Sequence, residues 1–262
     1  MAGTFAEFLS RNSIVPAKRM PLVHSTAAYH LKSIAQENAI IPRPCDVFKG
    51  EDLSYFFVGR PAYKYGREES DAQEWQLPCC FIFAFDSIRS TKRIFPFDSG
   101  GFSRGLYPDH ISMMNRDEFD VGTVADAPEK IVGAYFGDIQ SYLMLRPKSR
   151  IEFEREFSLG VLDAEIKALH RLATSEGERG ADDRRLSIEV QSASVLDMTV
   201  NKPLAVILPA PYYEEKSIRD HVENAWGAVP ISYPMSSLSV KMYFALIYDR
   251  VASFYKNELG II

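Results

Sequence analysis

The chain has 262 residues, enough to bury a sizeable core as one domain with elaborations or as two small domains. Hydrophobic residues make up 46% of the chain and charged residues 25%, which is the usage of ordinary globular proteins and excludes a low-complexity chain. The formal net charge of -5 argues against a broad basic surface for duplex nucleic acid, while a local basic patch stays compatible with it.

The first predicted element is a short helix from Thr4 to Ser13, because Thr4 and Glu7 have the spacing of a capping box. A short apolar strand is then expected to end at His24. After it, Thr26 is an acceptable helix N-cap, apolar residues recur at helical spacing, and Asn38 is a plausible left-handed end. The sequence therefore predicts a strand, a junction and an amphipathic helix.

His24, Ser25 and Thr26 are expected at that strand-to-helix junction. Free N–H groups and the positive end of the helix dipole favour polar or anionic ligand atoms at such a place. Taken alone, His24 and Thr26 could equally be explained as capping residues with no ligand-binding role. The aromatic block that comes later in the chain favours the ligand-binding interpretation.

That block begins with the aromatic residues Tyr55, Phe56 and Phe57 and continues with Gly59, Arg60 and Pro61. Glycine allows the backbone to approach a ligand closely, and a guanidinium pairs with phosphate or carboxylate. Aromatic runs are usually strand core, but Pro61 removes a ladder donor, so the strand should end before it.

The middle of the chain is predicted to alternate polar and apolar segments. Residues 66–76 are polar and read as a surface excursion, whereas the apolar run from Cys79 to Phe85 is too continuous for an exposed edge strand. Cys79 and Cys80 are predicted core residues, since the three cysteines form no zinc or redox motif. Residues 87–127 are the least regular region and are expected over or beside a pocket.

Two helices are predicted next, one starting at Pro128 and one over residues 159–174, where His170 is expected to be solvated or stabilised by the helix dipole. The later segments give a buried strand over 204–208, a helix over 214–225, a further strand over 229–232 and the longest helix over 239–259, ending at Gly260.

Glu189 lies in a run where Leu186, Ile188 and Val190 alternate with polar residues. Period-two alternation predicts a half-buried strand with Glu189 on its polar face. Residues 175–183 form a glycine-containing, charge-rich loop just before it. A glutamate on the solvent face of an edge strand is common, so Glu189 acquires meaning only together with the earlier segments.

The segments LVHST, HLKSI and YFFVGRP together resemble the ADP-ribosyltransferases, most closely the toxin-type enzymes of the DarT kind that modify DNA. The resemblance covers about forty residues. It implies an α+β fold in which split, mostly antiparallel β-sheets enclose an NAD cleft with helices outside. It also implies one domain over 1–262 with an N-terminal helix and C-terminal helical elaborations from about residue 200.

The resemblance further assigns roles. Glu189 and Arg60 would be catalytic, with Glu189 stabilising the oxocarbenium-like charge on the ribose and Arg60 pairing with pyrophosphate or helping the acceptor lose its proton. The NAD-binding residues would be His24, Ser25, Thr26, Tyr55 and Phe56, with Lys64 and Tyr65 as weaker candidates. Nicotinamide would stack on Tyr55 or its neighbours.

The expected function is thus transfer of ADP-ribose from NAD to a nucleic-acid or protein acceptor, as in a toxin or defence effector held in check by an antitoxin or regulator. NAD hydrolysis, RNA 2′-phosphotransfer and a non-catalytic NAD or ADP-ribose-binding module are the alternatives. The sequence predicts no metal site and no membrane span. An odd number of cysteines and no recognised signal peptide predict a cytoplasmic location.

Overall fold

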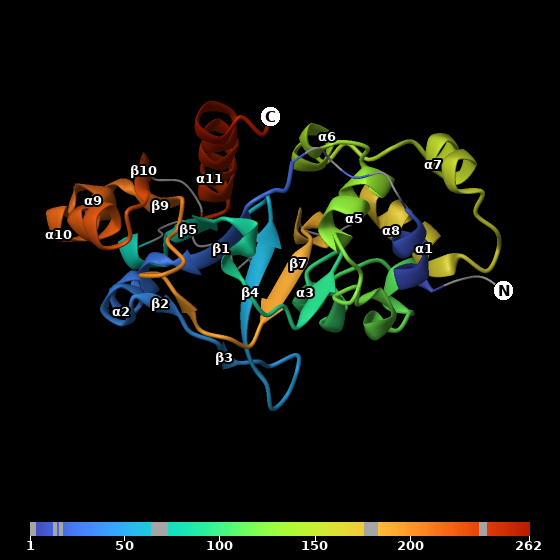
Figure 1. Cartoon of the computed structure of the whole chain (residues 1–262), viewed down its shortest axis with the longest axis horizontal. Coiled ribbons are helices and arrows are strands. Elements are labelled where there is room, and N and C mark those ends of the chain that lie inside the picture. Colours follow the sequence, from blue (N-terminus) through green and yellow to red (C-terminus); the bar gives the residue numbers. More distant parts are fainter. Residues whose placement is uncertain (1–3, 13–14, 16–17, 64–72, 176–182, 236–239) are drawn as a thin grey trace. The chain divides into compact units, whose positions relative to one another are not determined.

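The computed structural model describes residues 4–12, 15, 18–63, 73–175, 183–235 and 240–262 (Figure 1). The fold is of the predicted α+β kind. The chain divides into two compact units: the first holds the residues up to 19, 46–49 and 91–191, and the second holds 20–45, 50–90 and 192–262. The expectation of a single domain over 1–262 stays a prediction.

The second unit is built on a sheet whose strands follow the order β10-β9-β5-β1-β4 (Figure 1). All neighbours in it are antiparallel except β9 and β10, which are parallel. The main strands are β1 (Leu22–Ala27), β4 (Asp52–Val58), β5 (Pro78–Phe83), β9 (Ala205–Pro209) and β10 (Val229–Tyr233); β3 (Arg43–Pro44) pairs with β4, and β2 (Ala39–Ile40) pairs with β8 (Leu196–Asp197).

Strand β5 is the centre of this sheet, and every residue of it is buried, as its continuous apolar sequence predicts. Burial raises the pKa of the Cys79 and Cys80 thiols, so both stay protonated at neutral pH. The predicted strands over 204–208 and 229–232 are confirmed as β9 and β10. Residues beyond 200 therefore supply two strands of this sheet in addition to helices.

The two strands that flank β1 pair with it over different lengths. It pairs with β5 over its full length, from Leu22 opposite Phe83 to Ala27 opposite Pro78. Its pairing with β4 among the described residues is confined to Leu22 opposite Val58 and Val23 opposite Phe57. From His24 onwards, β1 is therefore held by β5 alone, which leaves the part of β1 with the predicted ligand-binding residues without its second strand partner.

Helix α11 (Val240–Phe254) is the longest helix of the second unit and packs against β5 and β10. It continues as a π-helical turn to Leu259 and ends at Gly260 with φ 55°, which confirms both the predicted helix and its left-handed end. The predicted helix over 214–225 is wrong as one piece, because the extended Glu215 caps a new helix by accepting from the Ser217 N–H. Its pieces are α9 (Ala210–Glu214), α10 (Lys216–Asp220) and a π-helical turn (His221–Ala225).

The first unit is largely helical around a two-stranded pair, β6 (Arg93–Phe95) and β7 (Glu189–Ser192), the last residue of which belongs to the second unit. The predicted capping box is present, since Thr4 and Glu7 exchange hydrogen bonds at the start of α1. The helices are α1 (Phe5–Arg11), α3 (Ser99–Ser103), α4 (Asp109–Ser112), α5 (Ala127–Tyr135), α6 (Ile139–Leu143), α7 (Arg150–Phe157) and α8 (Ala164–Thr174).

Three predictions in this unit are corrected. The helix predicted from Pro128 breaks at Gly137, whose φ of 87° ends α5, and Asp138 then caps α6. The helix predicted over 159–174 begins only at Ala164, with Leu162 exposed. His170 is buried, because its ring stacks on Phe153 with 4.3 Å between ring centroids.

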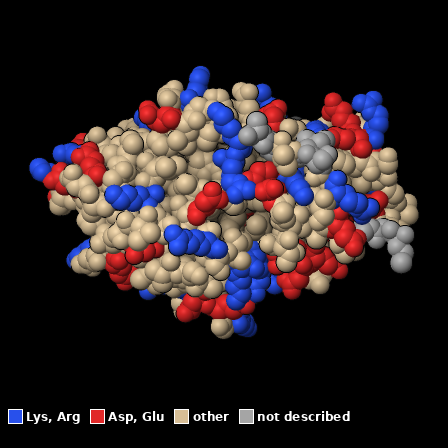
Figure 2. All heavy atoms as spheres, viewed as in Figure 1, with Lys and Arg blue, Asp and Glu red and all other residues tan. Residues whose placement is uncertain are grey.

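On the face drawn in Figure 2, the described acidic and basic side chains are interspersed instead of gathering into one basic area. Among the described residues, no broad basic area suited to duplex nucleic acid is seen on that face (Figure 2). In the described part of the chain, no helix combines the length and the apolar character needed to cross a membrane.

Candidate catalytic and nucleotide-binding residues

The predicted site residues fall into both units. Glu189 belongs to the first unit, whereas His24, Ser25, Thr26, Tyr55, Phe56 and Arg60 belong to the second. The second-unit residues come from β1, from β4 and from the turn after β4. Lys64, Tyr65 and most of the loop over 175–183 lie outside the described residues.

Glu189 begins β7, and its carboxylate is held by three hydrogen bonds. Oε2 accepts from the Ser99 backbone N–H at 3.1 Å, and Oε1 accepts from the Ser99 hydroxyl at 2.7 Å and from Gln191 Nε2 at 2.7 Å. A carboxylate has about four acceptor positions, so these contacts leave one open. The group is fixed in orientation and can still accept one further hydrogen bond.

The surroundings of Glu189 disfavour ionisation of its carboxyl group. Glu189 is 1% exposed. Burial, reinforced by the nearby Asp98 carboxylate, raises the pKa of Glu189 to about 8, and the hydrogen bonds from Ser99 and Gln191 oppose that rise. The prediction of a half-buried strand is wrong here, since all four residues of β7 are buried on both faces.

Ser99 reaches Glu189 because a short turn of helix is fixed around it. Asp98 is the N-cap of α3 and accepts from the Gly101 N–H, and Arg184 Nη1 lies 3.4 Å from the other Asp98 oxygen. The Tyr107 hydroxyl donates to the Asp98 carbonyl. A Cβ at residue 101 would stand 2.8 Å from that hydroxyl, which explains the glycine. Residues 87–127, predicted only to lie near a pocket, supply this support.

His24 on β1 is linked to β4 through its side chain. Its Nδ1 lies 2.9 Å from the Tyr55 carbonyl, which can only accept, so Nδ1 carries the proton. Its ring packs on Phe56 and Phe81 with centroids 5.4 and 6.4 Å away. Burial lowers the pKa of His24, against the hydrogen bond to Tyr55 that raises it. The neutral ring therefore offers Nε2 as an acceptor for a hydroxyl.

Ser25 and Thr26 do not lie at a helix N-terminus. Strand β1 continues to Ala27 and is followed by a 3₁₀ turn (Ala28–His30) before α2 (Leu31–Glu37). The prediction of Thr26 as an N-cap is wrong because its backbone stays in the sheet opposite Cys79. Any ligand contact of these residues would come from a strand edge and not from a helix dipole. Asn38 ends α2 with φ 48°, as predicted.

Arg60 is a buried arginine of the second unit with hydrogen-bond donors that lack described partners. Gly59 has φ 67° and turns the chain after β4, and Arg60 is then buried at 4% exposure. Its guanidinium stands 5.3 Å from the centroid of the Tyr248 ring on α11. Its Nε and Nη1 are buried and bond to none of the described residues. Buried donors without partners are costly, so this guanidinium is suited to an anion that supplies acceptors.

The two aromatic NAD-binding candidates, Tyr55 and Phe56, differ in how much of each ring is exposed. Phe56 is fully buried and packs behind His24 and against Phe83, so it supports the histidine from the core. Tyr55 is half-buried, and its hydroxyl lies 2.7 Å from Cys45 Sγ. Of the two, only Tyr55 has ring surface that a ligand can meet. Tyr248, beside Arg60, carried no sequence signal that distinguished it from the apolar stripe of α11.

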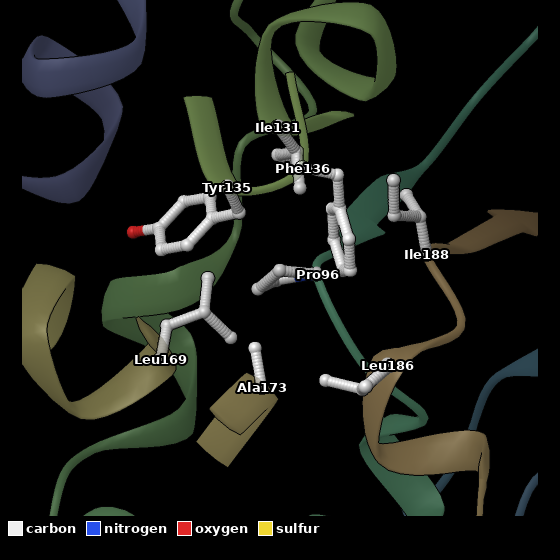
Figure 3. A pocket seen from close by; sticks show the side chains of 8 residues that line it. All are labelled: Pro96, Ile131, Tyr135, Phe136, Leu169, Ala173, Leu186 and Ile188. Atoms are coloured by element: carbon white, nitrogen blue, oxygen red, sulfur yellow. The ribbon is translucent and has the colours of Figure 1, made fainter. Parts of the chain in front are cut away.

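A small apolar cavity of the first unit is lined in part by Leu186 and Ile188, which precede β7 (Figure 3). It holds about 10 Å³ and is lined by Pro96, Ile131, Tyr135, Phe136, Leu169, Ala173, Leu186 and Ile188. This apolar space is about the size of one water molecule and offers too few polar partners to hold one. It is a packing gap and not a nucleotide site. Among the described residues, no group of three His, Cys, Asp or Glu side chains could hold a metal ion.

Comparisons of the chain with protein-family models, with curated proteins and with solved structures gave no match. The chemistry of the site therefore rests on its own residues.

Proposed function

We propose that the protein is an ADP-ribosyltransferase that uses NAD as its substrate and has the split-sheet fold of that superfamily. The observation that carries the proposal is the buried Glu189 carboxylate, oriented by Ser99 and Gln191 with one acceptor position open. Cleavage of the bond between nicotinamide and ribose builds positive charge on the sugar. A fixed carboxylate that accepts from a ribose hydroxyl stabilises that charge in the transition state.

The candidate residues of the second unit have chemistry that suits the other parts of NAD. Neutral His24 would accept from a ribose hydroxyl through Nε2, Arg60 would pair with the pyrophosphate, and Tyr55 would meet the nicotinamide ring. Ser25 and Thr26 would line the same edge of β1. Because Glu189 is 1% exposed, a ribose hydroxyl reaches it only when surrounding groups move.

The acceptor is proposed to be a nucleic acid or a protein, and a regulator that restrains the activity is part of the proposal. A direct test incubates purified protein with NAD labelled in the ADP-ribose part and with separate pools of DNA, RNA and protein. Label in one pool, lost in Glu189→Gln and kept in Glu129→Gln, is the expected result. Glu129 is a matched control because it is also a buried glutamate of the first unit, at 7% exposure.

Other results of this test would change the assignment. Release of nicotinamide without labelled acceptor would make the protein an NAD glycohydrolase. Absence of NAD consumption with every pool, together with measurable NAD binding, would overturn the transferase and leave a nucleotide-binding module.

A further inference from the structure

Gln191 has a part in the Glu189 site that its sequence position alone does not reveal. It lies two residues after Glu189 in β7, so the two side chains share one face of the strand. Its side chain is completely buried. Its Nε2 donates to Glu189 Oε1 at 2.7 Å and lies 3.1 Å from the Ser99 hydroxyl oxygen.

The orientation of this amide is set by its other end. Gln191 Oε1 accepts from Arg93 Nη1 at 3.2 Å. A guanidinium can only donate, so it requires the amide oxygen on its side and thereby turns the NH₂ group towards Glu189. The reversed amide would place an oxygen against the carboxylate and an NH₂ group against the guanidinium, and both contacts would be repulsive.

Arg93 is itself held in place. It lies on β6 directly opposite Gln191, and its guanidinium stands 4.2 Å from the centroid of the Phe48 ring. Arg116 contacts the same ring at 4.1 Å but bonds to Ser103 and Asp117. The two arginines thus share an aromatic partner, and of the two it is Arg93 that donates to Gln191.

We propose that Gln191, oriented by Arg93, is a positioning residue that favours the ionised form of the Glu189 carboxyl and fixes its orientation towards the substrate. This assignment rests on the proposed function for its catalytic consequence. Among the described residues, Asp98 also disfavours ionisation of Glu189, and Arg184 pairs with Asp98. Arg93 acts on Glu189 through the amide it orients.

The test titrates the Glu189 carboxyl by carbon NMR and measures the pH profile of NAD cleavage in the same variants. Gln191→Met removes the donor at similar volume and should raise the pKa of Glu189 by about one unit. Arg93→Met should raise it in the same direction by less, and Arg93→Lys should restore it in part. In each variant the rising limb of kcat/KM should move to higher pH by the same amount.

Arg116→Met is the matched control, since it removes an equal charge from the same Phe48 ring without touching Gln191. It should leave both the titration and the pH profile unchanged. The proposal is overturned if Gln191→Met and Arg93→Met titrate like the unaltered protein, or if Arg116→Met shifts Glu189 as much as Arg93→Met does.

The two readouts separate this proposal from the proposed function. NMR titration requires no NAD, so a protein that does not cleave NAD would refute the transferase and still decide whether Gln191 supports the charged carboxylate. Arg93 is only half-buried, so its variants should fold even if Gln191→Met does not. The titration of Glu189 in Arg93→Met and Arg93→Lys then tests the proposal.

Discussion

Glu189 of the first unit and Arg60 of the second are both buried ionisable side chains, but their hydrogen-bonding surroundings differ. Glu189 accepts three hydrogen bonds from Ser99 and Gln191. Arg60 is 4% exposed, and its Nε and Nη1 bond to none of the described residues. The first arrangement orients a group before substrate arrives, whereas the second leaves donors that a ligand must satisfy.

The difference has an energetic meaning. A buried donor without a partner costs about 1–3 kcal/mol, whereas a fixed network returns much of the cost of burying its charge. Glu189 is therefore suited to act on a transition state, and Arg60 is suited to bind an anion at the expense of stability. Each of the following changes tests one side of this contrast.

Arg60→Met should have the largest effect on binding. Loss of a charge-assisted contact of about 1.5–3 kcal/mol corresponds to a roughly 10- to 100-fold weaker affinity for NAD. The same change removes unpaired buried donors, so the free energy of unfolding without NAD should stay the same or increase. Calorimetric titration and thermal unfolding measure the two quantities. Weaker stability with unchanged affinity would contradict the contrast.

Ser99→Ala should reduce NAD cleavage by about tenfold, because it removes one of the hydrogen bonds that orient a charged carboxylate. Ser103→Ala is the control, since Ser103 lies on the same helix and bonds to Arg116 instead. Steady-state rates for the two variants give the comparison. Equal rates for both would show that Glu189 needs no support from Ser99.

Stability against pH should separate Glu189 from the other ionisable groups. Its folded pKa is raised from 4.5 to about 8, so its favourable contribution is complete below about pH 4.5 and is lost as pH rises through 8. The stability of the unaltered protein relative to Glu189→Gln should therefore fall by about 1 kcal/mol per pH unit in that window. Urea unfolding at several pH values tests this, and a constant difference would show an unshifted carboxyl.

His24 and His170 have the opposite dependence. Burial lowers the pKa of both, so their contributions are present above about pH 6.5 and are lost as pH falls below it. The comparison with Glu189→Gln at each pH cancels these losses, since both proteins contain the two histidines.

Ile188→Val should have the smallest effect. It removes one methyl group from the lining of the small apolar cavity and should cost about 1 kcal/mol of stability. Cleavage of NAD should change by less than twofold, because polar contacts orient Glu189 and the apolar packing behind it does not. A loss of activity as large as that of Ser99→Ala would show that the packing positions the carboxylate.

The sequence predicted the regular elements whose pattern is local. The capping box at Thr4, the left-handed ends at Asn38 and Gly260, and the continuous apolar strand β5 all follow from neighbouring residues. Prediction from the sequence failed where the local structure depends on a distant strand partner or on a single glycine. Thr26 stays in the sheet because β5 pairs with it, and Gly137 divides a helix whose apolar stripe continues across the break.

The supports of the candidate site could not be predicted for the same reason. Gln191 shares a strand face with Glu189 by period-two spacing. However, Ser99 and Arg93 come from a segment about ninety residues away in the chain, and no spacing rule links that segment to Glu189. The aromatic block before Arg60 was predicted from the sequence, but the burial of Arg60 Nε and Nη1 beside Tyr248 of α11 depends on tertiary packing.

We propose that Glu189 acts mainly on the transition state of NAD cleavage and contributes little to NAD affinity. The most direct measurement compares the dissociation constant for NAD with the rate of nicotinamide release in the unaltered protein and in Glu189→Gln. We predict a rate lower by about 100- to 1000-fold with an affinity within about threefold. An unchanged rate, or a loss of affinity that accounts for the whole loss of rate, would contradict the claim.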